Sequence, residues 1–124
     1  MDAYLIYERE EGEKNRGFIE MFRREGMRYG ISFLFVPKER YKEMPFPVFV
    51  LNRTRDKEVS LWYEKENVPV FHDSTVVEIG NDKWRTYSYL KKHMDENSFS
   101  LPDTIYLPKF RNEDLYEAVI RAGW

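Results

Sequence analysis

The chain has 124 residues, with 20 Lys and Arg against 22 Asp and Glu, a formal net charge of −2, 42% hydrophobic and 17% aromatic residues, and no cysteine. This composition excludes global disorder, disulfides and thiolate chemistry, and the near-neutral charge gives no strong field for nucleic acid or an anionic membrane. No run approaches the roughly 18 apolar residues of a membrane span, and the N-terminus lacks the pattern of a signal peptide, so we expect a soluble, cytoplasmic protein.

The first half of the chain alternates apolar runs with one helical pattern. Three continuous apolar runs predict buried strands, at residues 3–7, 31–36 and 48–51. Between the first two runs, Phe18, Ile19 and Phe22 fall on one face of a helix. Gly26 or Gly30 could end this helix, because glycine is common just past helix C-termini.

The second half continues the alternation. The expected elements are a helix at 56–66, a strand at 68–71, a short helix through 79, a helix capped by Asn81 or Asp82, a loop at 95–103, an extended segment at 104–107 and a helix at 112–121. Trp84, Tyr87 and Leu90 form an apolar stripe that we expect in the core, and Leu115, Val119 and Ile120 are expected to face inward.

Strands that are apolar without alternation are typical of a parallel sheet, which is buried on both faces. Helices between such strands indicate an α/β fold, with an open, Rossmann-like parallel sheet and helices on both faces.

Common active-site motifs are missing from the sequence. It has no G-x-G-x-x-G, no G-K-[ST] and no G-x-S-x-G, and no metal-ligand spacing surrounds its histidines, so we predict neither catalytic nor metal-binding residues in this chain. We interpret His93 as a solvated residue near a helix C-terminus. The acidic residues Glu8, Glu10, Glu11 and Glu13 are interpreted as a solvated loop and first helical turn in preference to a cation site.

Four residues are candidates for binding. Arg53 and Arg55 follow a predicted strand, where they could bind a carboxylate or phosphate or lie in an ordinary surface loop. His72 also follows a strand, and a turn or capping role competes with ligand binding there. Lys83 stands in the first turn of a helix, where the dipole disfavours a cation unless an anion binds nearby; the alternative is an exposed lysine.

The stretch from Phe49 to Thr104 resembles the N-terminal region of ATP-grasp ligases, especially RimK-type glutamate ligases. Four pieces carry the resemblance, namely Asn52-Arg53 at the end of a strand, the turn His72-Asp73-Ser74, the helix start Asn81-Asp82-Lys83-Trp84, and Leu101-Pro102-Asp103-Thr104. Their order and spacing match the family pattern, whereas His72 stands where many relatives have asparagine.

The resemblance implies a pre-ATP-grasp domain at residues 1–100 and the start of a truncated ATP-grasp domain at 101–124. Lys83 would contact the nucleotide phosphates, and Arg53, with Arg55 and His72, would face the substrate. ATP and Mg²⁺ would be cofactors of the full-length parent, and none is expected to bind tightly here.

The implied function is that of an N-terminal fragment of an ATP-dependent carboxylate–amine ligase that is catalytically incompetent alone. Its partners would be the missing C-terminal ATP-grasp domain, a small-molecule or peptide substrate and a second copy in a homo-oligomer. We expect no nucleic-acid or membrane partner.

Two other interpretations remain open. The chain could be a stand-alone Rossmann-like regulatory or interaction module without catalysis. A response-regulator-like receiver would need an aspartate at the end of the third strand, where Asn52 and Arg53 stand instead.

Overall fold

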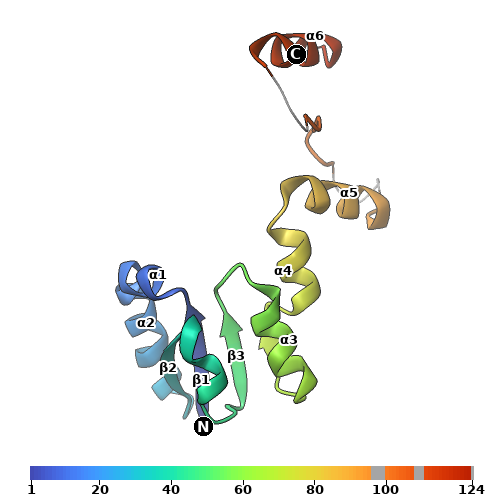
Figure 1. Cartoon of the computed structure of the whole chain (residues 1–124). Helices are drawn as coiled ribbons and strands as arrows, with labels where there is room; N and C mark the ends of the chain where they lie inside the picture. Colours follow the sequence, from blue (N-terminus) through green and yellow to red (C-terminus); the bar gives the residue numbers. More distant parts are fainter. Residues whose placement is uncertain (96–99, 108–110, 124) are drawn as a thin grey trace. The chain divides into compact units, whose positions relative to one another are not determined.

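In the computed structural model, which describes residues 1–95, 100–107 and 111–123, the chain forms two compact units, Met1–Asn81 and Asp82–Trp124 (Figure 1). The first unit contains, in order, β1 (Asp2–Tyr7), α1 (Arg9–Lys14), α2 (Arg16–Met27), β2 (Ser32–Pro37), the 3₁₀ helix η1 (Lys38–Glu43), β3 (Phe49–Asn52), α3 (Lys57–Lys65), β4 (Val70–Phe71) and α4 (Ser74–Gly80). The second contains α5 (Lys83–His93) and α6 (Asn112–Arg121). The expected domain boundary at residues 100 and 101 stays a prediction.

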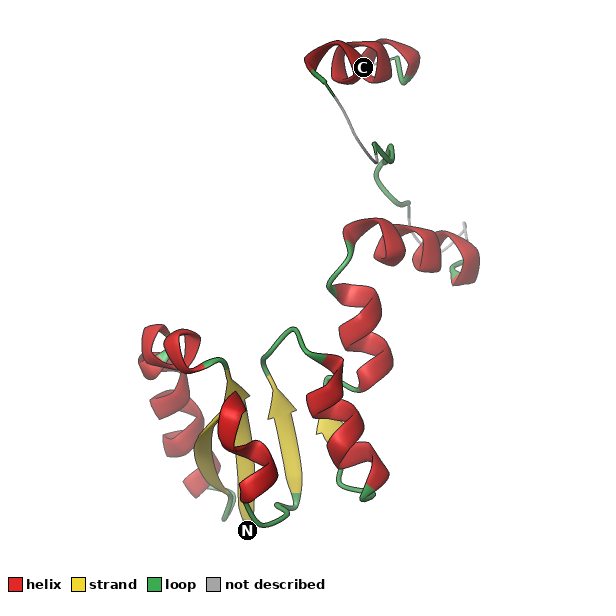
Figure 2. Cartoon of the chain, viewed as in Figure 1, coloured by secondary structure: helices red, strands yellow, loops and turns green. Residues whose placement is uncertain are grey.

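The four strands form one sheet in the order β2-β1-β3-β4, and every neighbouring pair is parallel. Leu5 of β1 lies opposite Phe35 of β2 on one side and Leu51 of β3 on the other. The predicted α/β class with a parallel sheet is therefore confirmed, and the expected strands lie within two residues of those observed. Figure 2 shows the sheet in yellow beside the helices of this unit in red.

Side-chain alternation along β1 divides the core into two clusters, one on each face of the sheet. Tyr4 and Ile6 belong to the cluster that includes Val59 and Tyr63 of α3. The residues between and beside them, Ala3, Leu5 and Tyr7, belong to the cluster that includes Ile19 of α2. Helices thus cover both faces, which explains why β1 is apolar from Ala3 to Tyr7.

Hydrophobic periodicity predicts neither of two short helices, although the acidic residues at 8–13 are expected in a loop and first helical turn. α1 lies in the charged stretch after β1, and its one buried residue is Gly12. η1 lies in the charged connector after β2, and its one buried residue is Tyr41. A single buried residue leaves no apolar periodicity to detect, so the hydrophobic pattern misses both helices.

The second unit corrects the expectation that the aromatic stripe of α5 is part of the core. α5 has no buried residue, and Trp84 is 36% exposed. The Trp84 ring stacks on Tyr87 with centroids 5.4 Å apart and on Tyr106 with centroids 5.2 Å apart. This small aromatic cluster satisfies the apolar periodicity without burying the side chains.

α6 has the predicted bounds, but two of its expected inward residues, Leu115 and Ile120, are exposed. The segment at 104–107, which is expected to be extended, does not pair as a strand. Part of the loop expected at 95–103 falls on residues 96–99, outside the described residues.

None of the helices in the described ranges is long and apolar enough to cross a lipid bilayer.

Candidate functional site

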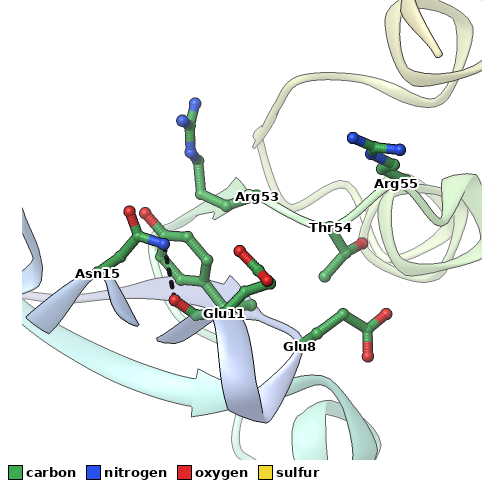
Figure 3. A pocket seen from close by; sticks show the side chains of 7 residues that line it. Glu8, Glu11, Asn15, Arg53, Thr54 and Arg55 are labelled. Carbon is green, nitrogen blue, oxygen red and sulfur yellow. Dashed lines mark hydrogen bonds between the residues drawn. The ribbon is translucent and has the colours of Figure 1, made fainter. Parts of the chain in front are cut away.

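A cavity of about 600 Å³ opens where β1 and β3 end. Its walls are Tyr7, Glu8, Glu11, Asn15, Arg53, Thr54 and Arg55 (Figure 3). The chain runs from β1 outward to β2 on one side and to β3 on the other, so this point is the topological switch of the sheet. Open α/β sheets bind their ligands at such a switch, outside the carboxyl ends of the strands. We call this space the switch-point cavity.

The loop that carries the arginines is organised by Asn52, the last residue of β3, which is 2% exposed. Its Oδ1 accepts hydrogen bonds from the backbone N–H of Thr54 at 3.0 Å and from the Thr54 hydroxyl at 2.7 Å. Its Nδ2 donates to Ser60 Oγ at 2.8 Å and to the Asp56 carbonyl at 3.2 Å. One buried amide therefore anchors the loop between β3 and α3 through three hydrogen bonds to Thr54 and Asp56 and joins it to α3 through a fourth, to Ser60.

Among the charged residues that line the cavity, the glutamates have ion-pair partners in the described chain and the arginines do not. Glu8 pairs with Lys38 at 2.8 Å, and Glu11 pairs with Lys14 at 2.9 Å. Arg53 and Arg55 form no ion pair with any described residue, and Figure 3 shows their guanidinium groups extending away from the two carboxylates. The Arg53 guanidinium lies over the Phe18 ring, 5.8 Å from its centroid. The cavity therefore presents uncompensated positive charge, which favours an anionic ligand.

Tyr7 contributes the buried wall of the cavity. It is 4% exposed, and its hydroxyl has no hydrogen-bond partner in the described part of the chain. An unsatisfied buried hydroxyl costs about 1–3 kcal/mol relative to one that is hydrogen-bonded.

Lys38 forms ion pairs that connect the loop between β3 and α3 with the residue that follows β1. Its Nζ lies 2.8 Å from Glu8 and 3.1 Å from Asp56. The hydrogen bond with Glu8, followed by the one with Asp56, raises the pKa of Lys38. The backbone N–H of Glu58 lowers the pKa of Asp56, and Lys38 lowers it further.

Asp56→Asn tests this electrostatic tie, because asparagine retains the ability to cap α3 but does not titrate. The pKa of Asp56 is lowered from 3.8 by folding, so its stabilising contribution is complete above that value and is lost as the pH falls through the lower, folded value. We expect the free energy of unfolding of Asp56→Asn to fall less steeply than that of the wild type from about pH 5 downward. Urea denaturation across this range measures it; parallel curves would contradict the expectation.

The structure brings together two of the four predicted binding residues. Arg53 and Arg55 line the switch-point cavity, whereas His72 is not among the lining residues. His72 follows β4, is exposed, and its carbonyl accepts a hydrogen bond from Ser60 Oγ at 2.7 Å. A substrate contact by its imidazole stays a prediction.

Lys83 is the first residue of α5, as predicted, and is exposed. Asp82 caps this helix by accepting a hydrogen bond from the backbone N–H of Arg85 at 2.9 Å. Lys83 belongs to the second unit, and its contact with a nucleotide stays a prediction.

Sequence reasoning missed several lining residues. Glu8 and Glu11 are exposed at the start of α1, as the interpretation of a solvated loop and first helical turn expects, but their place beside the arginines, like that of Tyr7, Asn15 and Thr54, is not predicted. The available signal was Asn52, a polar residue that ends an otherwise apolar strand and thereby marks an organised loop. Among the described residues, no group of three or more His, Asp or Glu side chains could hold a metal ion.

Comparison with known proteins finds no family model that matches the chain, and no significant match to a curated protein or a solved structure.

Proposed function

We propose that the switch-point cavity binds a small carboxylate, and that the chain is the N-terminal α/β region of an ATP-dependent carboxylate–amine ligase of the ATP-grasp type. The observation that carries the proposal is the pair Arg53 and Arg55, which line a cavity at the sheet's switch point without an ion-pair partner in the described chain. Guanidinium groups bind carboxylates through charge-assisted, often bidentate hydrogen bonds. A cavity of about 600 Å³ has the size typical of small-molecule sites.

In the proposed reaction, the carboxylate attacks the γ-phosphate of ATP, which gives an acyl phosphate and ADP, and an amine then displaces inorganic phosphate to form the amide. Arg53 and Arg55 would hold the carboxylate in a productive orientation. Lys83 would contact the nucleotide phosphates, and His72 would lie on the substrate side. ATP and Mg²⁺ would be held by a C-terminal ATP-grasp domain of the parent, where Mg²⁺ neutralises phosphate charge.

Calorimetric titration of the 124-residue chain with glutarate tests the carboxylate site. We expect saturable binding that Arg53→Gln weakens about tenfold or more, because the substitution removes a charge-assisted hydrogen bond. Arg40→Gln is the matched control, since Arg40 is exposed, lies on η1 outside the cavity and pairs only loosely with Glu43 at 3.4 Å. Equal affinities for the wild type and Arg53→Gln would contradict the site.

Titration of the same chain with ATP tests the ligase assignment. We expect affinity no tighter than micromolar and no hydrolysis, because the proposal places most nucleotide contacts in another domain. Tight ATP binding by the isolated chain would contradict this division of roles. Reading the coding sequence beyond residue 124 is the complementary test, and a strand lysine followed by a Gly-rich loop would support the ligase.

The second candidate is a regulatory module that binds the same carboxylate without catalysis. It is supported by the position of all the cavity-lining residues within the first compact unit, Met1–Asn81. Under this alternative, glutarate binding and the Arg53→Gln effect persist, and the coding sequence carries no nucleotide-binding elements.

A further inference from the structure

The two outer strands of the sheet differ in the length of open edge that they present. β4 has only two residues, whereas β2, at the other edge, runs over the six residues Ser32–Pro37. A long, apolar outer strand is a template for pairing with a strand of another molecule, and a short outer strand or charged side chains on it oppose such pairing. β2 is apolar after Ser32 and contains no charged residue. Protection of this edge therefore has to come from another element of the fold.

The backbone groups on the open edge of β2 belong to Phe33 and Phe35. The backbone N–H of Ser32 donates to the Met1 carbonyl at 2.7 Å, so the backbone groups of Ser32 are directed toward β1. This direction alternates along a strand, so the N–H and C=O groups of Phe33 and Phe35 are directed away from β1. Pro37, the last residue of β2, has no N–H to donate. A strand arriving at this edge would pair with Phe33 and Phe35.

An arginine of α2 already occupies one of these edge groups. α2 lies beside β2 (Figure 1), and the Nε–H of Arg23 donates a hydrogen bond to the Phe33 carbonyl at 3.3 Å. The same guanidinium forms an ion pair with Glu20, one turn earlier on α2. An arriving strand would have to displace Arg23 from the Phe33 carbonyl or bury its charge, and either change costs free energy.

We infer that Arg23 keeps the outer edge of β2 closed to a strand from another copy of the chain. The inference goes beyond the proposed function and is independent of it, because Arg23 is not among the residues that line the switch-point cavity. The strand that a second copy offers is β2 itself, which has the same open edge and no charge to repel an identical strand. Without Arg23, two copies of β2 would exchange backbone hydrogen bonds through Phe33 and Phe35.

Arg23→Ala removes the protecting side chain. By sedimentation velocity, we expect this variant to self-associate at concentrations about tenfold or more below those at which the wild type does, because pairing no longer has to displace a charge-assisted hydrogen bond.

Hydrogen exchange of the Phe35 backbone amide gives a readout at the edge itself. This amide should exchange rapidly in the wild type and become protected in Arg23→Ala as the protein concentration rises. The Leu5 amide, on the central strand β1, should stay protected in both proteins, which reports that the fold is intact.

Arg24→Ala is the matched control on the same helix. Arg24 is exposed and pairs with its neighbour Glu25 at 3.3 Å, so its loss leaves the edge of β2 covered, and this variant should associate as the wild type does. Ser32→Lys in the Arg23→Ala background tests the strand, because Ser32 is exposed on β2 and a lysine on an outer strand opposes pairing. The double variant should regain the behaviour of the wild type.

Three results would overturn the inference. The first is equal self-association of Arg23→Ala and Arg24→Ala. The second is self-association of Arg23→Ala that leaves the Phe35 amide unprotected or that Ser32→Lys does not suppress, because the contact between copies would then lie elsewhere on the surface. The third is slow exchange of the Phe35 amide in the dilute wild type, which would show that the edge of β2 is not open.

Discussion

Asn52→Leu is expected to lower the free energy of unfolding by about 2–4 kcal/mol, because two or more buried polar groups lose their partner at a cost of about 1–3 kcal/mol each. Leucine branches at the same carbon as asparagine and is larger, so no cavity forms and the loss reflects unpaired polar groups together with some overpacking. The backbone N–H of Thr54 and the Asp56 carbonyl lose the partners they have in the wild type. Urea denaturation monitored by tryptophan fluorescence measures the change.

Asn112→Leu is the control for Asn52→Leu, because Asn112 is exposed at the start of α6. A change within about 0.5 kcal/mol is expected there. We also expect Asn52→Leu to bind glutarate more weakly than the wild type at temperatures where the variant is folded. The reason is that the loop carrying Arg53 and Arg55 then lacks the Asn52 hydrogen bonds that anchor it. Unchanged stability of Asn52→Leu would show that the loop does not depend on this amide.

Gly26→Ala is expected to destabilise the first unit by about 1–3 kcal/mol, the usual cost of overpacking. A Cβ on Gly26 would lie 2.6 Å from the Phe33 ring and 2.8 Å from the Ile31 carbonyl oxygen. The backbone oxygen cannot move aside as a flexible side chain can, so α2 must shift from the sheet. Thermal denaturation measures the loss.

Gly17→Ala provides the opposite result in the same helix. A Cβ there meets no atom within 4 Å, so only the helix propensity changes. Alanine is favoured over glycine in helices by up to about 1 kcal/mol, and by less in the first turn. Equal effects of the two substitutions would contradict the close contact between α2 and β2.

The strands and the starts of α3, α4 and α5 could be predicted because each of them has a local signal. Three aspartates, Asp56, Asp73 and Asp82, cap α3, α4 and α5 by accepting backbone hydrogen bonds. All three precede an amphipathic stretch, which is the pattern that identifies an N-cap from sequence. The three continuous apolar runs likewise identify β1, β2 and β3.

Whether the apolar face of a helix is buried could not be predicted from its hydrophobic periodicity. Trp84 and Leu115 occupy apolar positions with helical spacing, yet neither is buried. An apolar stripe shows which face of a helix is suited to packing, whereas burial depends on another element lying over that face. The sequence pattern of α5 and α6 contains no information about that element.

Part of the site was predictable and part was not, for a topological reason. Arg53 and Arg55 could be found because they directly follow an apolar run. Tyr7 and Glu8 lie more than forty positions earlier, and only the strand order β2-β1-β3-β4 brings the end of β1 beside the end of β3. Strand order depends on long-range pairing, which hydrophobic periodicity does not encode.

The most direct test of the carboxylate site is an NMR titration of the ¹⁵N-labelled 124-residue chain with glutarate, observing side-chain Nε–H and backbone amide signals. Saturable shifts should concentrate on the Nε–H groups of Arg53 and Arg55 and on the Thr54 amide, with Arg40 unaffected. Shifts that do not saturate, or that appear equally at Arg40, would contradict a carboxylate-binding site at the switch point of the sheet.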